Sequence, residues 1–283
     1  TYLYIAGKKF GIMKVNTRTE TTYFARDGGS IGCAQIHPSK EYIAVGEKGD
    51  NPNIYIYEYP LMSVVKTLRR GTERSHMTMG FSASGAKLAS VGYEPDYSLV
   101  IWDWANESII LKAKAFSQEV YAIGFSGYRE DLLCTSGMAH IKFWKIAETF
   151  TGLKLKGSLG KFGQVELSDI SCFAILADEK VVSGSENGNL LLWEGNFIKT
   201  VMRQSKEKAC HSGQVNVVQI VRNKYLLTAG NDKYVRLWDL HTIDGLEADD
   251  SLCAYMQPLR EIFIADTCNI VNAQLDYFDA GRI

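Results

Sequence analysis

Three residues near the end of the chain, His211, Thr228 and Asp232, have the residue types of a hydrolytic triad. In such a triad an aspartate orients a histidine, which takes a proton from a hydroxyl nucleophile. The nucleophile must also sit on an exposed, sharp turn of the type Gly-x-Ser-x-Gly, and no such turn accompanies Thr228. Trp238 follows, and a buried indole N–H needs a hydrogen-bond acceptor. We therefore interpret the four residues as a structural, hydrogen-bonded set.

No other side chains have the spacing of a catalytic, cofactor-binding or metal site. The remaining histidines occur singly, and we expect turn or surface positions for His37, His76, His140 and His241. The six cysteines form no Cys-x-x-Cys pair, which argues against zinc and for buried positions in a reducing compartment. Glycine-rich Ser183–Gly188 leads from strand to strand, whereas a phosphate cradle precedes a helix. We expect neither an enzyme nor a cofactor.

The charge balance bears on the partners. The 283 residues include 31 basic and 32 acidic side chains, for a net charge of −1. Nucleic-acid binding and membrane attraction both need a basic excess, so neither partner is expected. No apolar run approaches the ~18 residues of a membrane span. Because the chain starts at Thr1 rather than at a methionine, we expect it to be excised from a longer protein.

A repeat of about 45 residues positions these side chains. In five segments an aromatic residue follows a short apolar run: residues 53–57, 99–103, 140–144, 189–193 and 234–239. The aromatic positions, Tyr57, Trp102, Trp144, Trp193 and Trp238, lie 45, 42, 49 and 45 residues apart. A four-stranded propeller blade takes roughly 40–45 residues. Upstream of each aromatic segment lies another expected strand that ends in glycine. We expect this glycine to adopt the positive φ of a tight hairpin.

The repeat predicts an all-β fold, a WD-repeat β-propeller. Residues 27–247 are expected to form five full blades, residues 1–26 the strands of a first, partial blade, and residues 248–283 the start of a further blade. Because a propeller protects its sheet edges by closing its ring, we expect seven blades, with the ring completed outside this chain. The last full blade matches the WD-repeat signature best, since His211, Thr228, Asp232 and Trp238 match the family's structural tetrad.

Two turns are candidates for a protein-binding surface. The stretch from the glycine to the aromatic position is longest in two neighbouring blades, at 11 residues for Gly46–Tyr57 and 10 for Gly92–Trp102. Tyrosine offers contact area at low entropy cost, and proline stiffens a loop before binding. The candidate residues are Lys48, Asp50, Asn51, Pro52, Tyr93, Glu94, Pro95, Asp96 and Tyr97. The alternative is that both turns are solvated loops without a role, since loop length varies freely.

Several longer segments of the sequence resemble one branch of the WD-repeat family, cilia- and flagella-associated protein 44. They are Asn53–Pro60, Arg70–Glu73, Ala89–Gly92, Pro95–Tyr97, Ile101–Trp104, Lys114–Glu119, Phe150–Leu155, Gly157–Gly160 and Leu191–Gly195. These segments are spread over most of residues 1–245, and their sequences are not common to propellers in general. Beyond Asp244 the resemblance fades.

The resemblance implies a non-catalytic scaffold in the axoneme of motile cilia and flagella, within the cytoplasmic cytoskeleton. It implies a role in tethering inner-arm dynein motor domains to doublet microtubules. The implied partners are the sister cilia- and flagella-associated protein 43, an inner-arm dynein heavy chain and the doublet microtubule. A general intracellular WD-repeat adaptor for another complex stays open as the alternative, and so does an enzyme that uses a propeller's central channel.

Overall fold

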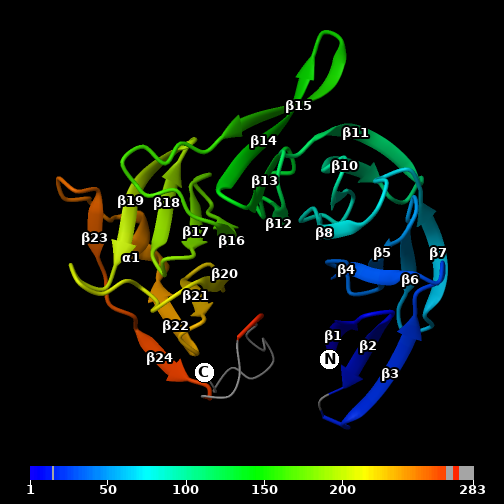
Figure 1. Cartoon of the computed structure of the whole chain (residues 1–283), viewed down its shortest axis with the longest axis horizontal. Coiled ribbons are helices and arrows are strands. Elements are labelled where there is room, and N and C mark those ends of the chain that lie inside the picture. Colours follow the sequence, from blue (N-terminus) through cyan, green and yellow to red (C-terminus); the bar gives the residue numbers. More distant parts are fainter. Residues whose placement is uncertain (15, 266–269, 274–283) are drawn as a thin grey trace. The chain divides into compact units, whose positions relative to one another are not determined.

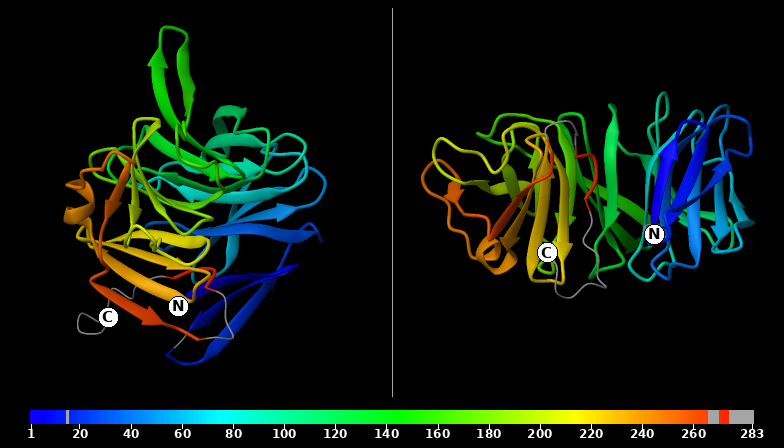
Figure 2. Two further views of the ribbon diagram at one scale, coloured as in Figure 1. Left: turned by 60° about the vertical axis from the view of Figure 1, so that its left-hand side comes forward. Right: turned by 90° about the horizontal axis from the view of Figure 1, so that it is seen from below.

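The computed structural model describes residues 1–14, 16–265 and 270–273. Within them, 24 β-strands form six sheets, and one short helix is present. The chain forms two compact units, which we describe one at a time. The first comprises residues 1–135 and 144–157, and the second residues 136–143 and 158–283. Figures 1 and 2 show the strands in chain order.

The first unit contains three complete sheets of antiparallel strands joined in chain order. The first has three strands, β1 (Tyr2–Ala6), β2 (Lys9–Lys14) and β3 (Thr19–Phe24). The second has four, β4 (Ser30–Ile36), β5 (Tyr42–Lys48), β6 (Ile54–Glu58) and β7 (Ser63–Leu68). The third also has four, β8 (His76–Phe81), β9 (Leu88–Gly92), β10 (Ser98–Asp103) and β11 (Ser108–Lys114).

The fourth sheet contributes strands to both units. It consists of β12 (Val120–Phe125), β13 (Leu132–Gly137), β14 (His140–Thr149) and β15 (Gly152–Leu159). Strand β14 has 10 residues and β15 has 8, whereas β12 and β13 have 6 each. The extra length accounts for the widest interval in the sequence repeat.

The second unit contains two sheets that share a C-terminal extension. Its strands are β16 (Ile170–Ile175), β17 (Val181–Ser185), β18 (Leu190–Glu194), β19 (Phe197–Arg203), β20 (Val215–Val221), β21 (Tyr225–Gly230) and β22 (Tyr234–Asp239). After helix α1 (Leu240–Asp244), strand β23 (Cys253–Tyr255) pairs in parallel with β19. Strand β24 (Arg260–Phe263) then pairs with β22.

This extension differs from the expectation that residues 248–283 begin a further blade. Both of its strands join sheets that already exist, so β24 supplies the outer strand of the β20–β22 sheet. The remainder of the predicted blade, 266–269 and 274–283, lies outside the described residues. The expected all-β propeller fold is observed with six sheets, and the count of seven blades stays a prediction.

In several sheets the third strand is apolar on both faces, as is typical of a strand that is buried on both faces. Residues Ile54–Tyr57 of β6 and Leu190–Trp193 of β18 are all buried. The pairing with the outer strand shifts register at the aromatic position, between Ile101 and Trp102 and again between Leu192 and Trp193. The sequence repeat therefore corresponds to a repeat of backbone irregularities as well as of side chains.

The glycines that end the second strands have a different role from the one predicted. Positive φ was expected, but neither Gly92 nor Gly230 has it. A Cβ at Gly92 would overlap the hydroxyl of Thr72, and a Cβ at Gly230 would lie 2.8 Å from His211 Nδ1. Glycine is required here because a neighbouring side chain packs directly against the strand backbone.

Candidate functional site

The four residues of the predicted tetrad form one chain of hydrogen bonds in the β20–β22 sheet. His211 Nδ1 lies 2.8 Å from Asp232 Oδ1, and His211 Nε2 lies 2.7 Å from Thr228 Oγ1. The Trp238 indole donates to Thr228 Oγ1 at 2.8 Å. Thr228 and Trp238 are fully buried, and His211 is 1% exposed. The Thr228 hydroxyl is thus enclosed and already bonded on both sides, unlike a nucleophile that must meet a substrate.

A fifth side chain, Arg236 on β22, joins this chain and was missed from the sequence. Its Nη1 donates to Asp232 Oδ2 at 2.6 Å and lies 2.8 Å from His211 Nδ1. Its Nε donates to Glu261 Oε2 on β24 at 3.1 Å. The sequence shows that Arg236 lies four residues after Asp232. It does not show that Glu261 also bonds to Arg236, because that contact depends on the pairing of β24 with β22.

The charges in this network follow from burial and pairing. Burial lowers the pKa of His211, against the opposing influence of Asp232, so the imidazole is neutral. In that state Nδ1–H donates to Asp232, and Nε2 accepts from the Thr228 hydroxyl. Burial by itself would raise the pKa of Asp232, but hydrogen bonds from His211 and Arg236 outweigh it and hold that pKa well below its usual range.

Half of the tetrad recurs in three other sheets. The Trp102 indole donates to Ser90 Oγ at 2.9 Å, and the Trp193 indole donates to Ser183 Oγ at 2.9 Å. The Trp144 indole donates to Thr135 Oγ1, also at 2.9 Å. A buried indole N–H needs an acceptor wherever it occurs, so this pair persists where the histidine is lost.

The β8–β11 sheet contains a second connection that involves a candidate binding residue. Thr72 donates to Asp96 Oδ1 at 2.9 Å, and Thr72 is 3% exposed. Asp96 precedes Trp102 by six residues, as Asp232 precedes Trp238. Asp96 therefore occupies the tetrad position of the turn aspartate, with threonine in place of histidine. This placement takes Asp96 out of the predicted contact surface.

Three of the four solitary histidines are buried, which corrects the expectation of turn or surface positions. His37, His76 and His140 are 9%, 1% and 1% exposed. Each has a ring nitrogen near a backbone carbonyl, of Gly85 for His37, Pro52 for His76 and Met138 for His140. Burial lowers the pKa of His76 to about 4, so this side chain is neutral at physiological pH. The fourth, His241, lies exposed on α1.

The two turns of the predicted binding surface are joined by the segment between their sheets, residues 71–75. Gly49 N–H donates to the carbonyl of Arg74 at 2.9 Å, and Asn51 N–H to that of Glu73 at 2.8 Å. On the other side, Tyr93 N–H donates to the carbonyl of Ser75 at 2.9 Å. Backbone hydrogen bonds therefore hold the two turns against one strip of chain.

Several candidate side chains in these turns are buried or hydrogen-bonded within the chain, so they are not free to contact a partner. Pro52 is buried, and Tyr97 is 8% exposed. The Tyr93 hydroxyl donates to Glu119 Oε1 at 2.7 Å, and this bond raises the pKa of Tyr93 to about 12. The predicted role of tyrosine as exposed contact area therefore fails for Tyr97.

The exposed remainder of both turns is compact and polar. We call it the turn surface, and its members are Asp50, Asn51, Glu73, Arg74, Glu94 and Pro95. Lys48 at its edge is half-buried. Asp50 and Arg74 lie 3.8 Å apart, at 81% and 66% exposure. Three acidic groups against one arginine make this surface acidic.

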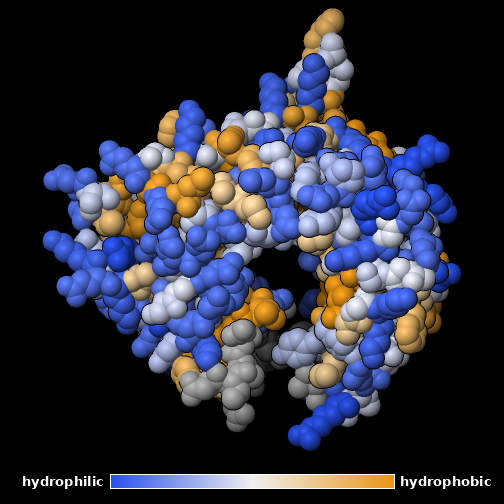
Figure 3. Space-filling model, viewed as in Figure 1, coloured by the Kyte–Doolittle hydropathy of each residue, from blue (hydrophilic) through white to orange (hydrophobic). Residues whose placement is uncertain are grey.

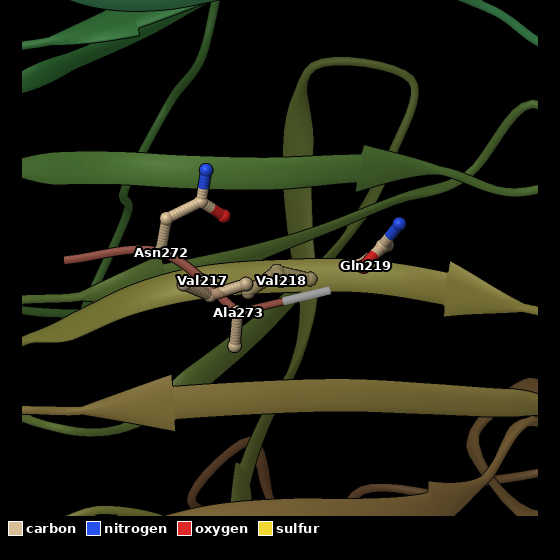
Figure 4. A pocket seen from close by; sticks show the side chains of 5 residues that line it. All are labelled: Val217, Val218, Gln219, Asn272 and Ala273. Atoms are coloured by element: carbon tan, nitrogen blue, oxygen red, sulfur yellow. The ribbon is translucent and has the colours of Figure 1, made fainter. Parts of the chain in front are cut away.

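The pocket beside β20 and the buried thiols of the described residues add no reactive group. A pocket of about 270 Å³ lies beside β20 and is lined by Val217, Val218, Gln219, Asn272 and Ala273. Figure 4 shows these five side chains. These side chains include no acid, base or nucleophile. No group of three metal-ligating side chains occurs among the described residues. Nor does the described chain contain a helix long and apolar enough to cross a membrane.

The cysteines agree with the expected burial in most cases. Cys33, Cys134, Cys172 and Cys210 are buried free thiols, and Cys253 is half-buried. Burial raises the pKa of Cys172 and of Cys210 to about 12, so both stay protonated and unreactive. The sixth cysteine, Cys268, lies outside the described residues.

Comparison with known proteins gives a family match over most of the chain. Residues 23–272 match the family model for the first β-propeller of echinoderm microtubule-associated protein. Echinoderm microtubule-associated protein-like 4 from Xenopus laevis is 28% identical over 90% of this chain and 28% of its own length. A solved β-propeller domain of Cps50 (Swd1) from Myceliophteria thermophila superimposes with a TM-score of 0.65 at 14% identity, over 82% of this chain and 71% of that one.

Higher identity is found with cilia- and flagella-associated protein 44. The mouse protein is 44% identical over 95% of this chain, and the Chlamydomonas reinhardtii protein is 45% identical over 90%. These matches confirm the resemblance predicted from the sequence. The chain spans about 15% of the length of either relative.

Proposed function

Because the chain belongs to the β-propeller family of echinoderm microtubule-associated protein and is similar to cilia- and flagella-associated protein 44, we propose that it is a non-catalytic scaffold of the axoneme. In this proposal it helps to tether inner-arm dynein motor domains to doublet microtubules. Its partners are the sister protein 43, a dynein heavy chain and the microtubule. The observation that carries the proposal is the 45% identity across 90% of the chain.

The absence of catalysis is part of the proposal and is supported by the tetrad. Its only hydroxyl, on Thr228, is 0% exposed and bonded to both His211 and Trp238. A substrate carbonyl would have to displace the indole to reach it. The hydrogen bonds of this set therefore link the strands of the sheet and leave no nucleophile free.

Localisation tests this proposal. The full-length protein, fused to a fluorescent tag, should enter the flagellum of a motile cell and stay with the axoneme after detergent extraction. Its deletion should release the motor domains of an inner-arm dynein from their ordered positions in tomograms of the doublet. A tagged protein that stays in the cell body would favour the general WD-repeat adaptor instead.

The turn surface is the part of this scaffold that we assign to a protein partner. Backbone bonds to residues 73–75 hold both turns in place, so binding would cost little further ordering. Its acidic side chains, Asp50, Glu73 and Glu94, fit a partner with a basic patch. Rigid support and an excess of acidic side chains distinguish this surface from a solvated loop without a role.

The test of the turn surface uses only its exposed side chains. Asp96 and Tyr97 must stay, because Asp96 bonds to Thr72 and Tyr97 is buried. Replacing Asp50 and Glu94 by serine should weaken capture of the partner at least tenfold, about 1.4 kcal/mol, with an unchanged melting temperature. Glu186→Ser, in the corresponding turn between β17 and β18, is the control. Equal capture by both variants would remove this surface from consideration.

A further inference from the structure

A second pocket lies in the first unit, between the β1–β3 sheet and the turn that joins β6 to β7. Its volume is about 110 Å³. The strands β2 and β3 and the turn line it with Ile12, Lys14, Thr19, Thr21, Tyr23, Tyr59 and Pro60. Pockets for small molecules and cofactors usually measure about 300–1,000 Å³. This pocket is therefore too small for a cofactor, and its size fits a single side chain of a partner.

The pocket is apolar at one end and polar at the other, because of three cross-strand pairs on one face of the β1–β3 sheet. The pairs are Phe10 with Tyr23, Ile12 with Thr21, and Lys14 with Thr19. Phe10 is fully buried and Ile12 is 6% exposed, whereas Lys14 is exposed. Along this face the side chains change from aromatic core to hydroxyl groups and then to an ammonium group.

The aromatic walls of the pocket are held in place by the core. Tyr23 and Tyr59 both pack against the core cluster between the first two sheets. The N–H of Met62 donates to the carbonyl of Glu58 at 2.7 Å, which closes the turn that carries Tyr59 and Pro60. Because these side chains are already ordered, they offer contact area with little entropy to lose on binding.

Strand alternation places positive charge at the pocket and negative charge away from it. Lys14 lines the pocket, whereas Glu20 lies on the opposite face of the sheet, where the Tyr4 hydroxyl donates to its carboxylate. Glu58 alternates with the tyrosines of β6 that pack toward the first sheet, so it points to the other side. Figure 3 shows hydrophilic surface at the turn between β2 and β3, where Arg18 is also exposed. The pocket is thus basic, in contrast with the turn surface.

We propose that this pocket binds an acidic, proline-containing segment of a partner protein in the polyproline II conformation. A proline ring of the segment packs against Tyr23, Tyr59 and Pro60, and a neighbouring glutamate pairs with Lys14. Aromatic-lined grooves suit such segments, because polyproline II is already extended and loses little entropy on binding. Its backbone has no internal hydrogen bonds, so its carbonyls are available to the hydroxyl of Thr21.

The single ammonium group selects a carboxylate and not a phosphoryl group. Phosphorylated motifs are recognised by clusters of arginine residues, whereas the pocket is lined by one lysine and two threonines. Room for one ring, walls of tyrosine and proline, and one ammonium group at the rim together define the ligand. It is a proline next to a carboxylate side chain.

The experiment measures binding of a fluorescein-labelled peptide of alternating proline and glutamate to the full-length protein by fluorescence anisotropy. Lys14→Glu should weaken binding at least tenfold, because it places a carboxylate beside those of the peptide. Thr21→Tyr should weaken it as much, because the larger side chain fills the pocket. The matched controls are Lys8→Glu, in the turn between β1 and β2, and Ser108→Tyr, at the exposed start of β11. Both controls should bind as the unaltered protein does.

Two further peptides separate the ring from the charge. A peptide of alternating proline and glutamine lacks the carboxylates, and one of alternating alanine and glutamate lacks the rings. Each should bind at least tenfold more weakly than the proline–glutamate peptide. Equal binding of the three peptides, equal binding by pocket and control variants, or binding lost only together with a lowered melting temperature would overturn the proposal. The assay uses purified components, so its outcome is separate from that of the axonemal role, which localisation tests.

Discussion

Replacing Asp232 by alanine should destabilise the second unit more than the loss of one hydrogen bond would. Asp232 is 7% exposed, and its ion-pair partner Arg236 is 5% exposed. Without the carboxylate, the remaining ion-pair partner of Arg236 is Glu261, which is 45% exposed, and the Nδ1–H of His211 loses its acceptor. Removing one partner of a buried ion pair typically costs about 3–5 kcal/mol. A single unsatisfied group costs about 1–3 kcal/mol. This smaller cost is the one expected for Asp232→Ala if only the hydrogen bonds of the four-residue tetrad were lost.

Urea denaturation followed by tryptophan fluorescence measures this free energy of unfolding. The cycle needs Asp232→Ala, Arg236→Met and the double variant, because contacting residues couple by about 0.5–3 kcal/mol. The double variant should be more stable than Asp232→Ala, since it removes the unpaired guanidinium. Additivity within about 0.5 kcal/mol would refute the buried pair. A loss below about 1 kcal/mol in Asp232→Ala would refute the network itself.

Two further predictions concern buried side chains. Trp238→Ala should cost roughly 3–5 kcal/mol in urea, because it removes a fully buried ring, and a wild-type midpoint would contradict the core position. Burial lowers the pKa of His76 to about 4 in the folded protein, whereas its pKa in the unfolded chain is near 6.5. Between pH 4 and pH 6.5 the unfolded state therefore binds more protons than the folded state. Stability should fall by up to about 3 kcal/mol as pH drops from 6.5 to 4. His76→Gln should lose less over this range, and an identical slope would show that His76 is not buried in neutral form.

Local sequence determined the strands, the repeat and the main contacts of the tetrad. A strand that is buried on both faces favours apolar residues on both, so runs such as Leu190–Trp193 were recognisable without a structure. The tetrad was found through its match to the WD-repeat signature, in which its members keep fixed places relative to the turns. The family resemblance rested on these same segments.

Tertiary structure alone decided which side chains are free for function. Asp96 and Tyr97 were in an exposed-looking turn, but Asp96 bonds to Thr72 from another loop and Tyr97 is buried. Strand β24 joins β22 across twenty residues of intervening chain, and only then does Glu261 reach Arg236. The residue pattern of a strand depends on adjacent residues and can therefore be recognised in a single sequence. Which distant segment fills a given space depends on the packing of the whole unit, and no local pattern encodes it.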